Sequence, residues 1–302
     1  MSVFSRVVTA TTRSRPVEKV ITGTTPGKAL ASRFVAGETL QDAVAIAADL
    51  NRSGFLVSLD LLGEEVHDEQ SARTALTEYL DCLDRIAEDS LDANISIKLT
   101  QLGLSIDREL TIELVGRLAE RAAEVGTTVT IDMEDSRFTS DTVDIFADAQ
   151  QKFGNLGIAL QAYMKRTPAD LDRLIPLGGH IRLCKGAYVE PPEVALTLKR
   201  AVDAAFAAQL EKMMAAESIR PAVATHDLEM VERTRQLAPQ RIGYFEFQML
   251  YGVRTALQQS LVEEGFPLRV YLPFGSQWYP YLTRRMAERP ANLWFFVRSL
   301  VD

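Results

Sequence analysis

The chain has 302 residues, enough for one large α/β domain or two small ones, and a hydrophobic content of 47% that is normal for a globular core. Its net charge of -8 at pH 7 argues against a nucleic-acid surface, because phosphate binding usually rests on a basic face. The 2 cysteines are too few for a disulfide framework and form no metal-ligand pattern with the 3 histidines. Composition therefore predicts an acidic, soluble protein of a reducing compartment, without nucleic acid or metal.

The N-terminal segment carries four basic residues, Arg6, Arg13, Arg15 and Lys19, against the single acidic Glu18. This balance is compatible with a transit peptide, but we favour a helical arm over residues 1–53. Helical spacing of apolar residues predicts one helix over 31–52, ended by a glycine. No apolar run approaches the roughly 18 to 20 residues that span a bilayer, so the expected location is the cytoplasm.

Eight short apolar segments alternate with helical ones from residue 54 to residue 302. Strands are predicted over 54–64, 94–100, 127–135, 156–163, 180–186, 221–227, 243–250 and 268–274. Predicted helices cover 70–89, 107–125, 141–153, a short stretch from 167, a long one from 191 to 217, and one after Asp227. Such alternation is typical of parallel βαβ units, and eight repeats indicate a closed (βα)₈ barrel of the TIM type.

A doubly wound open sheet is the alternative architecture. It would more often show a glycine-rich turn after the first strand, and no G-x-G-x-x-G occurs there. No Gly/Ser-rich linker divides the chain. We therefore expect a single domain over residues 1–302, in which the barrel occupies 54–302.

Polar residues stand near the predicted carboxyl ends of the strands, where parallel barrels hold their active sites. The set comprises Glu64, Lys98, Asp132, Gln161, Arg182, Lys185, Thr225, His226, Glu246, Gln248 and Tyr271. A buried charge is costly unless it is paired, so any one of these charged residues could be a structural ion pair. As a set they predict a site for an anionic small molecule, an anionic cofactor, or both. In contrast, His67 and His180 are predicted in a loop and at a strand start, in structural roles.

A second polar group follows the last predicted strand. A helix that begins at Pro280 places Tyr281, Arg284, Arg285 and Glu288 on one side. Adjacent guanidinium groups repel unless an anion lies between them, and the planar arginine fork matches a carboxylate or phosphate. Although a solvated face is the ordinary explanation of such a pair, the aromatic residues and apolar strand directly upstream favour the wall of an anion site.

These residues resemble the motifs of proline dehydrogenases, in particular the monofunctional bacterial type related to the flavin domain of the bifunctional proline-utilisation protein. The resemblance runs from about residue 34 to the C-terminus. The matching segments are DLLGE (60–64), IKLTQLG (97–103), IDMED (131–135), QAY (161–163), RLCKGAY (182–188), ATHD (224–227), EFQMLYG (246–252) and YLTRRMAE (281–288). Each is weak alone, but eight in this order are highly specific.

The resemblance implies a (βα)₈ barrel that holds FAD noncovalently on its carboxyl face. It also implies oxidation of L-proline to Δ1-pyrroline-5-carboxylate, the first step of proline catabolism, by hydride transfer from proline C5 to flavin N5. Electrons would pass to a quinone, through peripheral contact with the inner face of the membrane.

By the same resemblance, roles can be given to individual side chains. The proline carboxylate is expected to contact Lys98, Arg284 and Arg285. The ring pocket is expected to comprise Asp132, Tyr188, Leu250, Tyr271 and Tyr281. Arg182 would lie beside flavin N5, and the FAD would be lined by Gln161, Lys185, Gly186, Ala187, Thr225, His226 and Gln248. Glu64 would close the site by pairing with an arginine, for which we expect Arg285, while Glu288 supports the cluster.

Two other functions stay open from the residues alone. Lys98 or Lys185 would suit the nucleophile of a Schiff-base aldolase or lyase on the same barrel. The pair Arg284 and Arg285 would suit a non-enzymatic protein that binds an anionic ligand. Trapping of a carbonyl substrate on lysine would favour the first, and binding without turnover or flavin would favour the second.

Overall fold

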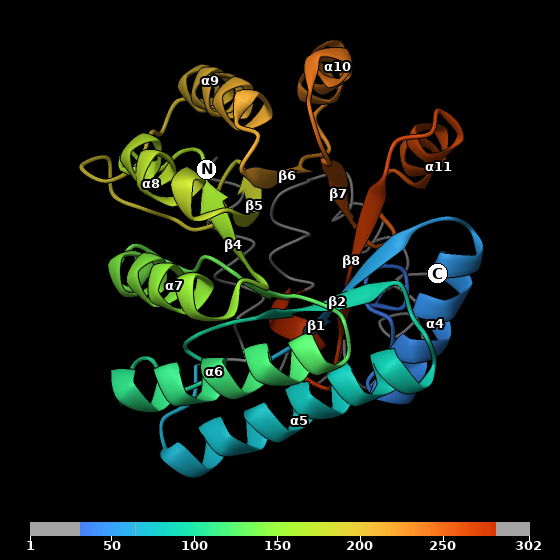
Figure 1. The fold of residues 1–302 in the computed structure, drawn as a ribbon, viewed down its shortest axis with the longest axis vertical. Helices are drawn as coiled ribbons and strands as arrows, with labels where there is room; N and C mark the ends of the chain where they lie inside the picture. Colours follow the sequence, from blue (N-terminus) through green and yellow to red (C-terminus); the bar gives the residue numbers. More distant parts are fainter. Residues whose placement is uncertain (1–30, 64, 282–302) are drawn as a thin grey trace, which may run out of the picture.

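The computed structural model describes residues 31–63 and 65–281. Within these residues eight strands close into a barrel in sequence order (Figure 1), which confirms the predicted (βα)₈ architecture. Every neighbouring pair is parallel, and the barrel is sealed where β1 pairs with β8, from Leu56 opposite Arg269 to Leu61 opposite Phe274. The strands are β1 (Leu56–Leu61), β2 (Ala93–Ile97), β3 (Val129–Ile131), β4 (Leu156–Gln161), β5 (Gly179–Cys184), β6 (Ile219–Ala224), β7 (Glu246–Leu250) and β8 (Leu268–Phe274).

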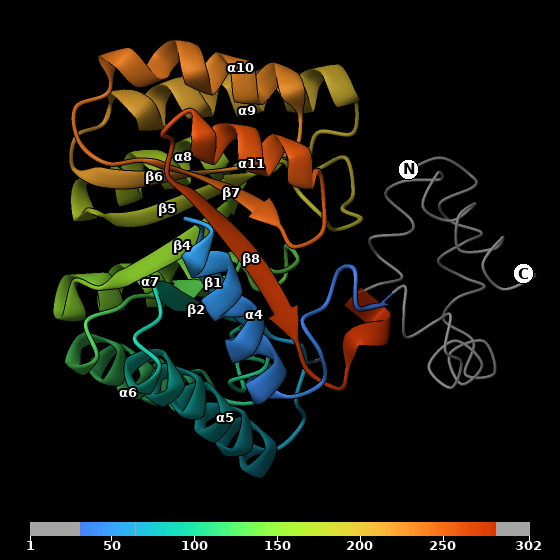
Figure 2. The same cartoon turned by 90° about the vertical axis from the view of Figure 1, so that its right-hand side faces the viewer.

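Helices form a ring around the strands in Figure 1. They are α4 (Leu40–Arg52), α5 (Glu69–Glu88), α6 (Arg108–Glu124), α7 (Thr139–Phe153), α8 (Thr167–Leu174), α9 (Lys199–Ala215), α10 (Leu228–Leu237) and α11 (Thr255–Glu263), with short 3₁₀ turns η1 (Ile175–Leu177) and η2 (Ala238–Gln240). Helix α4 packs against both β1 and β8, as Figure 2 shows from the side. It therefore covers the seam at which the barrel closes.

Helix starts follow their capping residues. Asp107 and Asp227 cap α6 and α10 by accepting hydrogen bonds from backbone N–H groups of the first turn. The helix predicted over 31–52 begins only at Leu40, because Thr39 and Asp42 form a capping box there. The long helix predicted from residue 191 likewise begins later, at Lys199.

The inside of the barrel is polar. Arg182 on β5 donates to Ser96 on β2 and to Gln248 on β7, and none of these strands are neighbours. These hydrogen bonds must therefore cross the interior. Because side chains alternate along a strand, the flanking aliphatic residues, such as Ile181 and Leu183 on β5, face the helices and form the buried core. The hydrophobic core thus lies between strands and helices, and the barrel axis is left for polar chemistry.

After β8, residues 278–281 are helical, so this helix begins two residues before the predicted start at Pro280. Trp278, Tyr279 and Tyr281 are buried in a small cluster with Phe34 and Val35. Arg284, Arg285 and Glu288 lie outside the described residues, as do Glu64 and most of the predicted arm. None of the helices in the described part of the chain is long and apolar enough to cross a membrane.

Candidate functional site

Arg182 occupies the middle of the barrel axis with only 5% of its surface exposed. Its Nε donates to Oε1 of Gln248 at 2.5 Å, and one terminal nitrogen donates to Oγ of Ser96 at 2.9 Å. The other terminal nitrogen forms an ion pair with Asp132. A guanidinium has five N–H groups, so two keep no partner within residues 31–63 and 65–281.

Asp132 directly follows β3 and has two partners in the site. One of its oxygens accepts a hydrogen bond from the guanidinium of Arg182, and the other accepts a hydrogen bond of 2.6 Å from the phenol of Tyr271. Burial and the charge of Asp132 raise the pKa of Tyr271 well above its ordinary value. Tyr271 therefore stays protonated and orients the carboxylate. Its ring also faces Arg182, with the guanidinium carbon 5.1 Å from the ring centre.

Lys98 follows the end of β2, and its Nζ lies 2.5 Å from Oδ1 of Asp60. Burial alone would lower the pKa of Lys98, but the charges of Asp60 and Asp132 outweigh burial and raise it. Asp60 is 1% exposed, so the pair is largely desolvated. The ammonium therefore remains charged at neutral pH, which disfavours Lys98 as the free amine that a Schiff base requires.

Lys185 lies just beyond β5 and forms ion pairs of 2.5 Å with Asp203 on α9 and with Asp227. The hydrogen bond from Lys185 lowers the pKa of Asp227. Two carboxylates thus hold this ammonium, and it is a poor candidate for a nucleophile. Lys98, Arg182 and Lys185 each have a carboxylate partner, so the unneutralised positive charge that suits an anionic ligand would have to come from Arg284 and Arg285.

The residues expected to line a cofactor gather around the carboxyl ends of β4 to β7. The amide of Gln161 donates to the carbonyl of Glu134 at 2.9 Å and accepts from the backbone N–H of Ala187 at 3.0 Å. Gly186 has a φ of 127°, and a Cβ there would lie 2.3 Å from the ring of Tyr163. Gln161 and Gly186 therefore fix the path of the loop that follows β5.

Three further residues of that set have backbone or side-chain contacts. Nε2 of His226 accepts a hydrogen bond from the backbone N–H of Leu250 at 3.0 Å. The hydroxyl of Thr225 accepts one from the backbone N–H of Asp227 at 3.1 Å. Gln248 is 3% exposed and lies inside the barrel beside Arg182. The backbone carbonyl of Tyr188, a residue predicted for the ring pocket, accepts the phenol of Tyr163 at 3.2 Å. The assignment of Thr225, His226 and Gln248 to a cofactor, and of Tyr188 to the ring pocket, remains a prediction.

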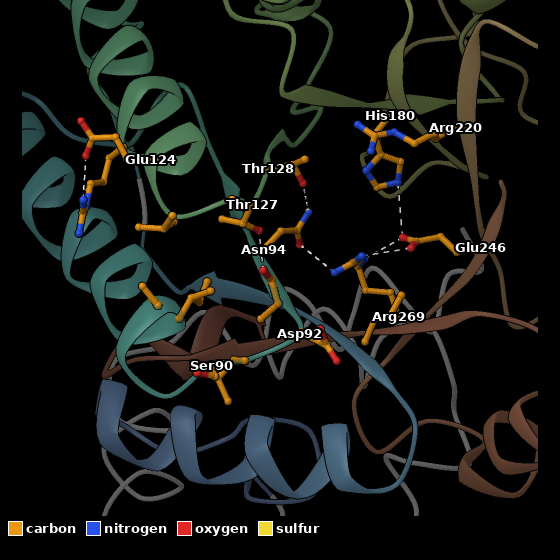
Figure 3. Close-up of a pocket in the computed structure, with 18 of the residues that line it drawn as sticks. Ser90, Asp92, Asn94, Glu124, Thr127, Thr128, His180, Arg220, Glu246 and Arg269 are labelled. Atoms are coloured by element: carbon orange, nitrogen blue, oxygen red, sulfur yellow. Dashed lines mark hydrogen bonds and ion pairs between the residues drawn. The ribbon is translucent and has the colours of Figure 1, made fainter. Parts of the chain in front are cut away.

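The placement of Glu246 at a carboxyl end was wrong. The strand predicted over 243–250 begins only at Glu246, so this residue opens β7 at the amino end of the barrel. A cavity of about 990 Å³ lies at that end, lined by Asn94, His180, Arg220, Glu246 and Arg269 among others (Figure 3). It faces away from the cation–carboxylate pairs described above. The alternation of polar residues along β7 was visible in the sequence, but the true first residue of the strand was not.

His180, next to Glu246, should make stability depend on pH. Burial lowers the pKa of His180 to about 3, with added effects of Arg269 and Arg182 and opposition from Glu246. In the unfolded chain His180 takes up a proton as the pH falls below its ordinary pKa of 6.5, whereas in the folded protein it does not. The free energy of unfolding should therefore fall by about 2 kcal/mol between about pH 7 and pH 5. Urea unfolding at both pH values measures this loss.

The matched variants for this measurement are His180→Asn and His67→Asn. In His180→Asn the free energy of unfolding should differ little between the two pH values. In His67→Asn, changed at an exposed loop position, it should decrease as in the wild type. Glu246 does not contribute in this window. Burial would raise the pKa of Glu246, but the charge of Arg269 lowers it to about 2, so its contribution is lost only below its ordinary value of 4.5. An unchanged pH dependence in His180→Asn would contradict the assignment.

A closed parallel barrel of this kind places the chain in the (βα)₈-barrel class, whose active sites lie at the carboxyl ends of the strands, where the charged pairs lie here. The family model described as proline dehydrogenase matches residues 43–298. The chain therefore belongs to the proline dehydrogenase family.

Individual relatives agree with this assignment. The chain is 40% identical to proline dehydrogenase 1 of Bacillus subtilis subsp. natto over 274 residues, which covers 90% of each chain. It is 36% identical to the proline dehydrogenase of Deinococcus radiodurans over 284 residues, again 90% of each chain. The crystal structure of proline utilization A from Bdellovibrio bacteriovorus superposes with a TM-score of 0.81 at 23% identity, covering 87% of this chain and 33% of that one. At that identity the superposition supports the barrel fold alone.

Proposed function

We propose that the protein is a FAD-dependent enzyme that oxidises L-proline to Δ1-pyrroline-5-carboxylate and passes the electrons to a quinone. The observation that carries the proposal is Arg182, a buried guanidinium on the barrel axis of a proline dehydrogenase family member, with two N–H groups left for a ligand. The quinone, reached by peripheral contact with the inner face of the membrane, rests on the resemblance alone.

The described residues fit FAD as a ligand. The carboxyl face brings together polar and charged side chains from several strands, and Gly186 lets the loop after β5 pack closely against the ring of Tyr163. Gln161, Arg182, Lys185, Gly186, Ala187, Thr225, His226 and Gln248 are the residues we assign to it. FAD, when bound, supplies the acceptor for the hydride that leaves C5 of proline.

The other assigned residues bind and orient proline. Lys98, with Arg284 and Arg285, would hold the carboxylate, because charge-assisted hydrogen bonds fix a planar anion well. Asp132, Tyr188, Leu250, Tyr271 and Tyr281 would shape the pocket around the ring. Holding C5 against the acceptor is a task of orientation, and Arg182 would stabilise negative charge that develops there. Glu64 and Glu288 would support the arginine pair.

An absorbance spectrum of the FAD-supplemented protein, before and after anaerobic addition of L-proline, tests the proposal. We expect oxidised-flavin bands that bleach with L-proline and stay unchanged with D-proline. Flavin bands that ignore L-proline would contradict the substrate, and a protein that binds no flavin would contradict the cofactor. In the second case, borohydride trapping on Lys98 or Lys185 would test the Schiff-base alternative.

A further inference from the structure

A chain of hydrogen bonds joins Arg182 to the amino end of the barrel. Nε of Arg182 donates to Oε1 of Gln248 at 2.5 Å, and Nε2 of Gln248 donates to Oε1 of Glu246 at 2.6 Å. Gln248 and Glu246 are 3% and 1% exposed. The chain thus runs through the interior from the proposed reaction centre to the side opposite it.

The chemistry of these groups gives Gln248 one orientation. A guanidinium only donates hydrogen bonds, so the oxygen of the Gln248 amide must face Arg182. An ionised carboxylate only accepts, so Glu246 requires the nitrogen of the same amide. Nε2 of His180 lies 3.3 Å from that nitrogen. The neutral ring that its lowered pKa implies can accept the second amide hydrogen at Nε2.

Glu246 is itself held in place by fixed donors. Arg269 reaches its two oxygens from Nε at 2.7 Å and from a terminal nitrogen at 3.1 Å, and the phenol of Tyr244 donates at 2.8 Å. Arg269 is anchored in turn to the carbonyl of Val57 at 2.8 Å. Figure 3 shows Arg269, Glu246 and His180 side by side at the cavity. The carboxylate therefore has a defined place and a charge that persists at neutral pH.

We propose that Glu246, acting through Gln248, is a positioning residue that fixes the guanidinium plane of Arg182 from the amino end of the barrel. The consequence for catalysis rests on the proposed function, because it needs Arg182 to act on the bound flavin. Without the carboxylate, the nitrogen of the Gln248 amide loses the acceptor that holds it. The amide can then move away from Arg182, and the guanidinium loses its inner support.

Glu246→Gln tests this directly, because the side chain keeps its size but loses its charge and one of its two acceptor oxygens. We expect L-proline to reduce the bound flavin about tenfold to a hundredfold more slowly. The midpoint potential of the flavin should become more negative, while the Kd for proline changes less than about twofold, since carboxylate binding is separate. In an Arg182→Lys background the same substitution should have almost no further effect on the rate, because both changes remove one interaction.

The control is Thr128→Val at the same cavity. Its hydroxyl accepts from Asn94 at 3.0 Å, and Asn94 contacts Arg269 only at 3.5 Å, so Thr128 lies outside the chain of short hydrogen bonds to Arg182. This variant should keep the rate and the potential of the wild type. If Glu246→Gln does not fold, Gln248→Met cuts the chain and leaves the Glu246–Arg269 pair intact. A wild-type rate and potential in the folded variant, or losses that add to those of Arg182→Lys, would overturn the proposal.

A readout without flavin separates this proposal from the proposed function. The Nε–H of Arg182 can be followed by ¹⁵N NMR in the protein without substrate, with its signal identified by its loss in Arg182→Lys. Glu246→Gln should speed exchange of this proton with solvent by about tenfold or more, and Thr128→Val should not. Unchanged exchange overturns the positioning role. A wild-type flavin that proline fails to bleach would instead overturn the proposed function, and the exchange result would still stand.

Discussion

Replacing Arg182 by alanine should slow the reduction of bound flavin by L-proline about a hundredfold to a thousandfold. Loss of one preorganised donor to developing negative charge has effects of this size in other enzymes. Arg182 is suited to that role because Gln248, Ser96 and Asp132 hold its plane and two N–H groups remain. Anaerobic stopped-flow absorbance of the flavin measures the rate, and redox titration should show a more negative midpoint potential.

Arg173→Ala is the matched control for this experiment. Arg173 is a half-exposed residue of α8 paired with Asp144 on the surface, and such pairs contribute about 0–1 kcal/mol. Its variant should reduce flavin at the wild-type rate. If Arg182→Ala did so too while binding FAD normally, Arg182 would have no part in the reaction.

Replacing Lys98 by methionine should have two separable effects. The KM for proline should rise about tenfold to a hundredfold, since hydrogen bonds to charged groups contribute about 1.5–3 kcal/mol. The free energy of unfolding should also fall by about 3–5 kcal/mol, because Asp60 is left as a buried charge without its partner. Steady-state kinetics and urea unfolding measure the two effects independently.

The double variant Lys98→Met with Asp60→Asn separates binding from stability. Neutralising Asp60 removes the unpaired charge, so most of the lost stability should return while the KM stays high. If the KM also returned to the wild-type value, Lys98 would act only as the structural partner of Asp60. In that case only Arg284 and Arg285 would bind the carboxylate of proline.

The number and order of the strands followed from the sequence because each is a short apolar run between helices, and the caps at Asp107 and Asp227 marked two helix starts. Strand boundaries did not follow, since Gly243, Tyr244 and Phe245 look like the strand that they precede. Glu246 was therefore assigned to the wrong end of the barrel.

The partners of the ion pairs could not be predicted from the sequence either. Asp60 and Lys98 are separated by thirty-seven intervening residues and meet only because β1 pairs with β2. Likewise, nothing in the local pattern shows that Gln248 would join Arg182 and Glu246 across the interior, because that link depends on closure of the barrel. The list of polar residues was predictable, whereas their division into proposed reaction centre and supporting chain required the three-dimensional arrangement.

Closure of the barrel by β1 and β8 also affects how the chain is made. The two partners of β1 are synthesised at very different times, because β2 follows soon after it whereas β8 begins only at Leu268. One edge of β1 therefore has no partner strand during most of synthesis, and unpaired strand edges promote aggregation. Helix α4 emerges before β1 and packs against it, so the nascent chain already carries a cover for the apolar face of this strand. Completion of β8 then converts a vulnerable intermediate into a barrel without edges.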